Sequence, residues 1–203
     1  MATVATLTKI PHHLATDGRV RRSQRSGHSI VEALLQLVGE GSVAPTAQQV
    51  AVRAGVGIRT VFRRFSDMES LFAEMDARLQ AEALPLLLGG RPEGRIEERA
   101  RALVRQRAAL FERIAPFKRS GNLKRQQSPF LQERHALLVR QLRADLRRWL
   151  PELRRSPADL INALDLALSF EAWDRLRVEQ RLSRERAQAA VEQMVLALVA
   201  KLR

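Results

Sequence analysis

Apolar residues recur at helical spacing from Ser26 onward, and this periodicity limits the chain to helical folds. Ile30, Leu34 and Val38 lie four residues apart within one stripe at positions i, i+3, i+4, i+7 and i+8. Leu, Ala, Arg, Glu and Gln, which favour helices, dominate the sequence, and β-branched residues never gather into alternating runs. We therefore predict an all-α fold.

A sharp corner is predicted between two short helices. Thr46 and Gln49 have the spacing of a capping box, in which the hydroxyl accepts a backbone N–H and the amide side chain reaches back. Gly55 suits the left-handed position that ends a helix abruptly, and Gly57 can serve as the next N-cap. A helix, a glycine-bearing turn and a short second helix form the pattern of a helix-turn-helix.

The helix after this corner, predicted over 58–65, has an apolar face and a cationic face. Val61 and Phe65 lie four residues apart on the inner face. Arginine can bond guanine O6 and N7, and threonine can bond a phosphate or touch a thymine methyl group. The outer face therefore suits DNA, and its residues are Arg59, Thr60, Arg63 and Arg64.

The chain is strongly basic, and its N-terminal third has the steepest bias. The formal net charge is +13, from 35 Lys and Arg against 22 Asp and Glu. Residues 1–66 hold nine of the basic residues and three of the acidic ones. Such a field attracts polyanions, although charge alone does not distinguish nucleic acid from anionic lipid. Residues 1–25 are predicted to form a flexible basic arm, in which Arg22 and Arg25 are candidate DNA contacts.

The order of residues from Thr46 to Leu71 resembles the tetracycline-repressor (TetR) family of bacterial transcriptional regulators, and the match covers about residues 28–72. The family pattern begins with Thr, an Ile/Val-Ala pair and an Ala-Gly-Val-Ser turn. It appears here as Thr46, Val50-Ala51 and Ala54-Gly55-Val56-Gly57. The later Thr-Leu-Tyr, Phe and Lys-Glu-x-Leu positions hold Thr60-Val61-Phe62, Phe65 and Met68-Glu69-Ser70-Leu71.

The resemblance implies a repressor that a small-molecule effector releases from a pseudo-palindromic operator in double-stranded DNA. Three positions depart from the family pattern, because Gly57 replaces a serine, Phe62 a tyrosine and Met68 a lysine. Each departure removes a polar group that could hold a phosphate, so more of the phosphate contact would fall on arginine. The DNA contacts that the resemblance implies are Thr46, Arg59, Thr60, Phe62, Arg63 and Arg64.

The rest of the chain is predicted to be helical and carries no short motif. Ser66 and Glu69 have capping-box spacing, which predicts a fourth helix that ends before the break "GGRPEG" at 89–94. One helix is predicted from this break to about Ala115, and a loop follows over 115–130. Three further helices are predicted from about Ser128 to Leu150, over about 157–179 and over about 183–202. We expect an arm at 1–25, a helix-turn-helix domain at 26–72, and a ligand-binding and dimerisation domain at 73–203.

The resemblance also implies a homodimer formed by the last two helices, whose apolar faces could instead form an ordinary helical core, and an effector pocket among the middle helices. The effector itself is unknown. Aromatic residues at helical spacing usually pack in a core, so each candidate has core packing as an alternative to pocket lining. The candidate pocket residues are Phe111, Phe117, Phe130, His135, Trp149, Phe170 and Trp173.

Other classes of function fit the sequence less well. An enzyme is not expected, because the chain lacks Cys and Tyr and its four histidines show no metal-ligand spacing. No cofactor or metal is predicted. The stretch "LRADLRRWLPELRR" at 142–155 is basic and amphipathic, which suits either a membrane surface or a helix packed on a core.

The alternative function is therefore a helical-bundle interaction or membrane-surface protein whose basic N-terminal domain binds polyanions non-specifically. No stretch is apolar enough to span a membrane, so no membrane partner is expected in the preferred interpretation. The absence of cysteine fits a cytoplasmic location.

Overall fold

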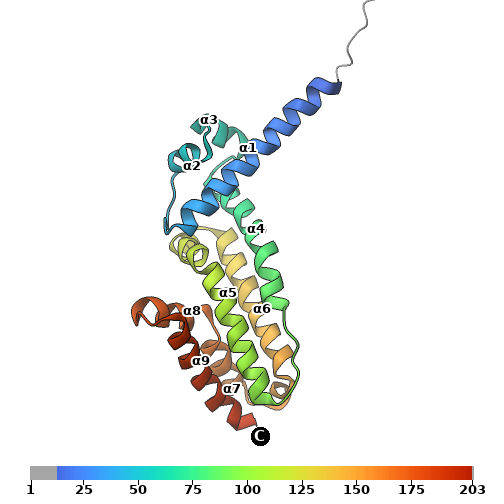
Figure 1. The fold of residues 1–203 in the computed structure, drawn as a ribbon, viewed down its shortest axis with the longest axis vertical. Coiled ribbons are helices and arrows are strands. Elements are labelled where there is room, and N and C mark those ends of the chain that lie inside the picture. Colours follow the sequence, from blue (N-terminus) through green and yellow to red (C-terminus); the bar gives the residue numbers. More distant parts are fainter. Residues whose placement is uncertain (1–12, 203) are drawn as a thin grey trace, which may run out of the picture.

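The computed structural model describes residues 13–202, with side chains from Arg25 onward, and it is helical throughout. Three helices form a small N-terminal group, and α4 leads from it into a bundle of longer helices (Figure 1). The predicted all-α fold is confirmed. The α-helices are α1 (His13–Gly39), α2 (Ala47–Ala54), α3 (Ile58–Arg64), α4 (Met68–Leu88), α5 (Ile96–Lys124), α6 (Pro129–Trp149), α7 (Ala158–Ala167), α8 (Phe170–Asp174) and α9 (Arg184–Val199).

Four short helical turns complete the described chain. The 3₁₀ turn η1 (Arg125–Gln127) joins α5 to α6, and η2 (Pro151–Arg155) follows α6. A π-helical turn, η3 (Arg175–Glu179), continues α8, and η4 (Ala200–Leu202) extends α9.

The N-terminal group has its own hydrophobic core, to which α1, α2, α3 and the first half of α4 contribute. This packing explains the stripe of apolar residues in α1, since that stripe faces the other helices. The buried residues include Ile30, Leu34, Val38, Val50, Val61, Leu71, Phe72 and Met75.

Helix α1 begins at His13, thirteen residues before the helix that the periodicity predicts from Ser26. The segment 13–25 contains no proline and holds four arginines, which a helix accommodates well. It therefore prolongs the helix where the sequence predicted a flexible arm. The Arg22 side chain lies outside the described residues, whereas Arg25 is exposed.

Three local predictions after the helix-turn-helix corner were wrong. Helix α4 is capped by Asp67, whose Oδ1 accepts the Ser70 N–H at 2.7 Å, rather than by Ser66. The carboxylate is the stronger acceptor, and Glu69 instead accepts a hydrogen bond from the Ser128 hydroxyl. The other two predictions concern α5 and the region of α7 and α8.

Helix α5 continues through Pro116 to Lys124, so most of the loop predicted over 115–130 is helical. Packing against α4 and α6 stabilises this last segment in spite of the proline, as tertiary contacts often override propensity. The single helix predicted over 157–179 is interrupted near Leu168, because Ser169 caps a new helix by accepting the Ala172 N–H at 3.1 Å.

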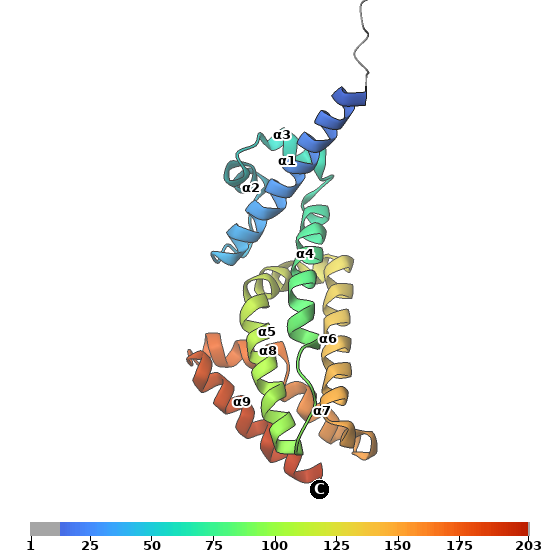
Figure 2. The ribbon, with the colours of Figure 1, turned by 45° about the vertical axis from the view of Figure 1, so that its right-hand side comes forward.

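Helix α5 lies at the centre of the C-terminal bundle, with α9 and α7 on one side and α4 and α6 on the other (Figures 1 and 2). The apolar residues of the amphipathic stretch at 142–155, including Leu146 and Trp149, are buried in this bundle. The stretch therefore packs on a core, and its apolar face is not available to a membrane surface. Within residues 13–202, no helix has the length and apolar character needed to cross a membrane.

Candidate functional site

The corner between α2 and α3 has the geometry that the sequence predicted. Gly55 has φ 66° and ψ 32°, a left-handed conformation that favours glycine. The Val56 N–H donates to the Ala51 carbonyl at 3.0 Å, which closes the end of α2. Gly57 follows as the N-cap of α3 and has no side chain to accept a hydrogen bond there.

Thr46 caps α2 through the predicted capping box. Its hydroxyl accepts the Gln49 N–H at 3.2 Å, and Gln49 Oε1 accepts the Thr46 N–H at 2.8 Å. The same hydroxyl also donates to Gln49 Oε1 at 3.0 Å. Because a hydroxyl has a single proton, a phosphate contact donated by the Thr46 side chain would require that last bond to break.

The outer face of α3 is cationic and accessible. Val61 is buried beneath it, whereas Arg59 and Arg63 are exposed and Thr60 is half-buried. Phe62, with 49% of its surface exposed, also lies on the outside. No acidic residue occurs between Gly41 and Ser66.

Two further arginines near this face are engaged within the protein. Arg53 of α2 forms a two-bond ion pair with Glu40, with both N–O distances at 2.8 Å. The Arg64 side chain extends from α3 to α1 and lies directly against Gly27. The positive field of α3 therefore rests mainly on Arg59 and Arg63, and Arg64 lies at the junction with α1.

A cavity of about 300 Å³ lies among α4, α5 and α6. Of the seven residues that the sequence suggested for an effector pocket, Phe117 and His135 line it. Phe130, at the start of α6, does not. The remaining four are packed in the hydrophobic core of the bundle, which is the usual place for aromatic residues at helical spacing, and they are Phe111, Trp149, Phe170 and Trp173.

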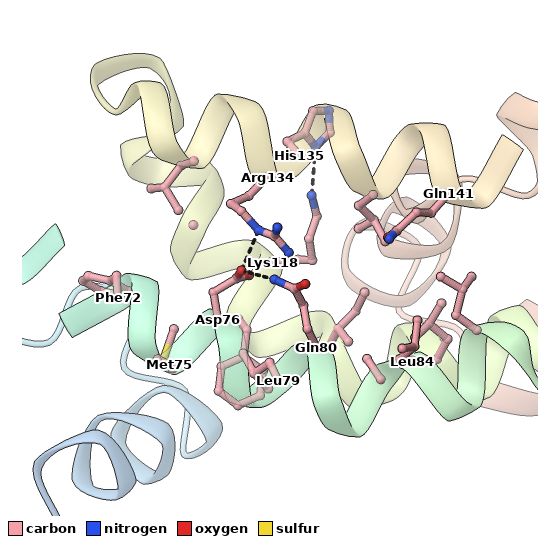
Figure 3. Close-up of a pocket in the computed structure, with 18 of the residues that line it drawn as sticks. Phe72, Met75, Asp76, Leu79, Gln80, Leu84, Lys118, Arg134, His135 and Gln141 are labelled. Atoms are coloured by element: carbon pink, nitrogen blue, oxygen red, sulfur yellow. Dashed lines mark hydrogen bonds and ion pairs between the residues drawn. The ribbon is translucent and has the colours of Figure 1, made fainter. Parts of the chain in front are cut away.

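Apart from His135, the polar residues of this cavity were not predicted from the sequence. Asp76 Oδ2 lies 2.6 Å from Arg134 Nε and also accepts a hydrogen bond from Gln80 Nε2 at 2.6 Å (Figure 3). Lys118 Nζ lies 2.9 Å from Nδ1 of His135. These residues come from three helices, and Lys118 lies in the segment predicted as a loop, so no spacing in the sequence joins them.

Burial dominates the ionisation of these groups. It raises the pKa of Asp76 even though the Arg134 guanidinium opposes this effect. It lowers the pKa of Lys118, although the charge of Glu171 opposes this effect; the positive charge of Arg125 lowers the pKa further. Burial also lowers the pKa of His135, with further lowering from Lys118 and Arg125.

Helix α4 joins this cavity to the helix-turn-helix. Phe72, Met75 and Leu79 belong to the N-terminal core and also line the cavity. Figure 2 shows α4 descending from α1 and α3 to run beside α5 and α6. A change in the cavity that moves α4 would therefore also move the hydrophobic core against which α3 packs.

Comparisons with known proteins agree with this geometry. Residues 30–75 match the profile of bacterial regulatory proteins of the tetR family. No curated protein matches this chain.

Two solved structures, both from a Rhodococcus species, have a similar fold. One is a transcriptional regulator with a TM-score of 0.66 and 20% identity, over 88% of this chain and 96% of its own. The other is a TetR transcriptional regulator with a TM-score of 0.52 and 18% identity, over 88% of this chain and 98% of its own. Residues 30–75 therefore carry a helix-turn-helix that matches the tetR family of bacterial regulatory proteins, and the chain shares the overall fold of these two structures.

Proposed function

We propose that this protein is a dimeric transcriptional repressor that binds a pseudo-palindromic operator and is released from it by a small-molecule ligand. The observation that carries the proposal is the position of α4, which contributes Phe72, Met75 and Leu79 both to the core beneath α3 and to the cavity. A ligand in the cavity acts on the same helix that supports the DNA-binding surface.

Helix α3 is the proposed recognition helix. Arg59 and Arg63, exposed and four residues apart, are placed to reach base edges in the major groove. Phosphate contacts are assigned to the exposed Arg64 and Arg25, to Thr60 and Thr46, and to the N-terminal amides of α2 and α4. Phe62 contributes apolar contact on the same exposed face. Arg22 is assigned to the DNA contacts on the basis of its sequence alone.

A second copy of the chain is proposed to pack on the C-terminal helices. Leu166 of α7 is 66% exposed, Val178 of η3 is 49% exposed and Met194 of α9 is 41% exposed. Exposed apolar side chains on neighbouring elements favour burial against a partner. A two-fold dimer would place two α3 helices on half-sites about 34–36 Å apart, one turn of DNA.

Ligand release is proposed to follow from a shift of α4 between two arrangements, one of which the ligand favours. A ligand that binds more tightly to one arrangement of α4, α5 and α6 shifts the population toward it, and the spacing of the two α3 helices changes with it. In this scheme residues 26–72 form the DNA-binding domain, residues 73–203 form the ligand-binding and dimerisation domain, and the protein acts in the cytoplasm.

Binding to the promoter DNA beside its own gene tests the proposal. Fluorescence anisotropy with that fragment and with a shuffled fragment of equal length should show tight, specific binding by a dimer. Binding that is equally strong to both fragments and only salt-sensitive would favour the alternative, a basic protein that attracts polyanions without reading sequence.

A further inference from the structure

The cavity among α4, α5 and α6 has two chemically different parts. Figure 3 shows Asp76, Lys118, Arg134 and His135 gathered together, with Leu84 farther along α4. A volume of about 300 Å³ lies at the lower end of the range for small-molecule sites, about 300–1,000 Å³. The apolar part is formed by Ala83, Leu84, Leu87, Leu110, Ile114 and Leu138.

The polar part holds more positive charge than its own carboxylate can balance. Lys118, Arg125 and Arg134 line the cavity, and Asp76 is the acidic residue among them. Asp76 is already bound to Arg134 and Gln80. Its charge therefore offsets that of Arg134 and leaves the other two cations.

Lys118 and Arg125 have neutral partners among the described residues. Lys118 Nζ contacts the His135 ring, and Arg125 Nη1 donates to Asn122 Oδ1 at 3.2 Å. No carboxylate in the described part of the chain forms an ion pair with either, and Glu171, whose charge reaches Lys118, is exposed on α8. Two cations thus line one cavity without an ion-pair partner among the described residues.

This arrangement is electrostatically unfavourable while the cavity holds no anion. Burial is the main reason why the pKa of Lys118 is lowered; the charge of Glu171 opposes this effect, and the neighbouring Arg125 adds to it. An anion bound between Lys118 and Arg125 would stabilise both charges and accept charge-assisted hydrogen bonds from them. The cavity is therefore complementary to a negative group attached to an apolar body.

We propose that the cavity binds an amphipathic carboxylate, with its anion at Lys118 and Arg125 and its apolar part against Leu84 and Leu87. This inference rests on the proposed function, since it specifies the chemical class of the ligand that would act on α4. Neutral or cationic compounds of the same shape would leave Lys118 and Arg125 without a counter-ion and would bind more weakly.

Asp76 has a defined part in this arrangement. It competes with the ligand for Arg134, because the ligand carboxylate offers the guanidinium a second acceptor. When Arg134 turns to the ligand, the ion pair between α4 and α6 is lost. Asp76→Asn should therefore bind carboxylates more tightly than the unchanged protein does, because the competing negative charge is gone.

Isothermal titration calorimetry on the full-length protein tests the ligand class. The probes are octanoate, decanoate and phenylbutyrate, each compared with the alcohol and the amine of the same carbon skeleton. We expect the carboxylates to bind at least about tenfold more tightly than their matched alcohols and amines. Equal or tighter binding of the alcohols or amines, or no binding of any carboxylate, would overturn the inference.

Variants identify the site of binding. Lys118→Gln and Arg125→Gln should each weaken binding of the carboxylate probes by about tenfold or more, since each removes one charged hydrogen bond. Arg105→Gln is the matched control, because Arg105 is an exposed cation of α5 that does not line the cavity. Unchanged carboxylate binding by both cavity variants, or an equal loss in the control, would contradict the assignment.

A separate measurement keeps this inference distinct from the proposed function. The same carboxylates are added to the complex of the protein with its promoter DNA. If they bind the cavity and the DNA stays bound, the ligand class stands and the release mechanism fails. If promoter DNA is bound specifically while amines bind the cavity best, the regulator stands and the ligand class fails.

Discussion

Arg64 of α3 lies directly against Gly27 of α1. A Cβ atom at position 27 would be 2.6 Å from Arg64 Nε, so the glycine makes room for the guanidinium. The contact crosses from the recognition helix to the first helix of the domain. Arg63, the preceding residue, is exposed on the outer face of α3. We therefore propose that the two arginines have different tasks, Arg63 at a base edge and Arg64 at a phosphate.

Alanine substitutions at these two positions should give different losses. Arg63→Ala should cost about 1–3 kcal/mol of specific binding and remove the preference at one base position, because we propose that Arg63 contacts a base edge. Arg64→Ala should weaken binding to all sequences alike and reduce the salt slope by about 0.9, as the loss of one phosphate contact does. Affinities measured against single-base operator variants at several salt concentrations decide this. The opposite pattern would exchange the two roles.

Gly27→Ala tests the contact between α1 and α3. Alanine is favoured over glycine inside a helix by up to about 1 kcal/mol, so the stability of the domain should not fall. The Arg64 guanidinium must move, however, and DNA affinity should fall as it does in Arg64→Ala. Thermal unfolding and DNA binding are measured on the same samples. A variant that binds DNA as well as the unchanged protein would show that the position of Arg64 over Gly27 has no role in binding.

Gly57→Ser should restore a cap that α3 lacks. The backbone at Gly57 is extended, with φ −71° and ψ 146°, and an added Cβ meets no atom within 4 Å. A serine hydroxyl can accept an N–H of the first turn of α3, with a gain of a few tenths of a kcal/mol in unfolding free energy, and can contact a phosphate. Gly57→Ala is the control, because it adds the Cβ without the hydroxyl. Equal effects of serine and alanine would contradict the capping explanation.

Arg107 and Asp145 form a buried ion pair in the bundle. Removing only one of them should destabilise the protein, because the other charge stays buried without its partner. Both side chains are 2% exposed, and Arg107 Nη2 lies 3.0 Å from Asp145 Oδ2. Burial lowers the pKa of Arg107 to about 10 in spite of this carboxylate. Asp145→Ala should destabilise the protein by about 3–5 kcal/mol, because it leaves a buried charge without its partner.

The double variant Arg107→Met, Asp145→Leu distinguishes charge from packing. It removes both charges and keeps apolar volume, so it should recover most of the unfolding free energy lost in Asp145→Ala. Chemical denaturation of the single and double variants gives the comparison. A double variant that is no more stable than Asp145→Ala would show that packing at these positions, rather than an unpaired charge, sets the cost.

Glu112 should make the stability of the C-terminal helices depend on pH. It accepts hydrogen bonds from Trp173 Nε1 at 3.0 Å and from Arg177 Nε at 2.8 Å. Burial alone would raise the pKa of Glu112, but these bonds and the Arg177 charge lower it below its ordinary value of 4.5. The stabilisation is therefore complete at neutral pH and is lost as the pH falls below 4.5 through the lowered pKa.

Glu112→Gln should accordingly reduce the unfolding free energy by about 1 kcal/mol at neutral pH, a value that allows for partial exposure of the pair. The difference from the unchanged protein should shrink as the pH falls below 4.5. Glu133→Gln, a change at an exposed glutamate of α6, is the control. A Glu112→Gln deficit that stays constant down to acidic pH would contradict the ionic contribution.

The sequence predicted best those features that depend on neighbouring residues. The capping box of Thr46 and Gln49 and the left-handed Gly55 are local, and the structure confirms both. The cap of α4 was misassigned because Ser66 and Asp67 each have a suitable residue three positions later. Local spacing does not distinguish the two caps. The structure does, because Glu69 accepts a hydrogen bond from Ser128, the N-cap of α6, instead of closing a capping box with Ser66.

The cavity depends on contacts between distant parts of the chain. Asp76 and Arg134 are 58 positions apart and meet only when α4 packs on α6. Lys118 enters the cavity only because α5 continues past Pro116. The aromatic residues chosen for the pocket were mostly core residues, since their size and spacing suit both environments. Charged residues from several helices form the polar part of this cavity, and no periodic pattern in the sequence marks them.

Selection of binding sites from random double-stranded DNA tests the central claim most directly, namely that the outer face of α3 reads a specific operator. Enriched sequences are identified and their affinities compared with those of shuffled controls. We predict a pseudo-palindrome with half-sites about one DNA turn apart, bound at least about 10³-fold more tightly than shuffled DNA, with lost preference at one position in Arg63→Ala. Equal, salt-sensitive binding to every sequence would contradict it.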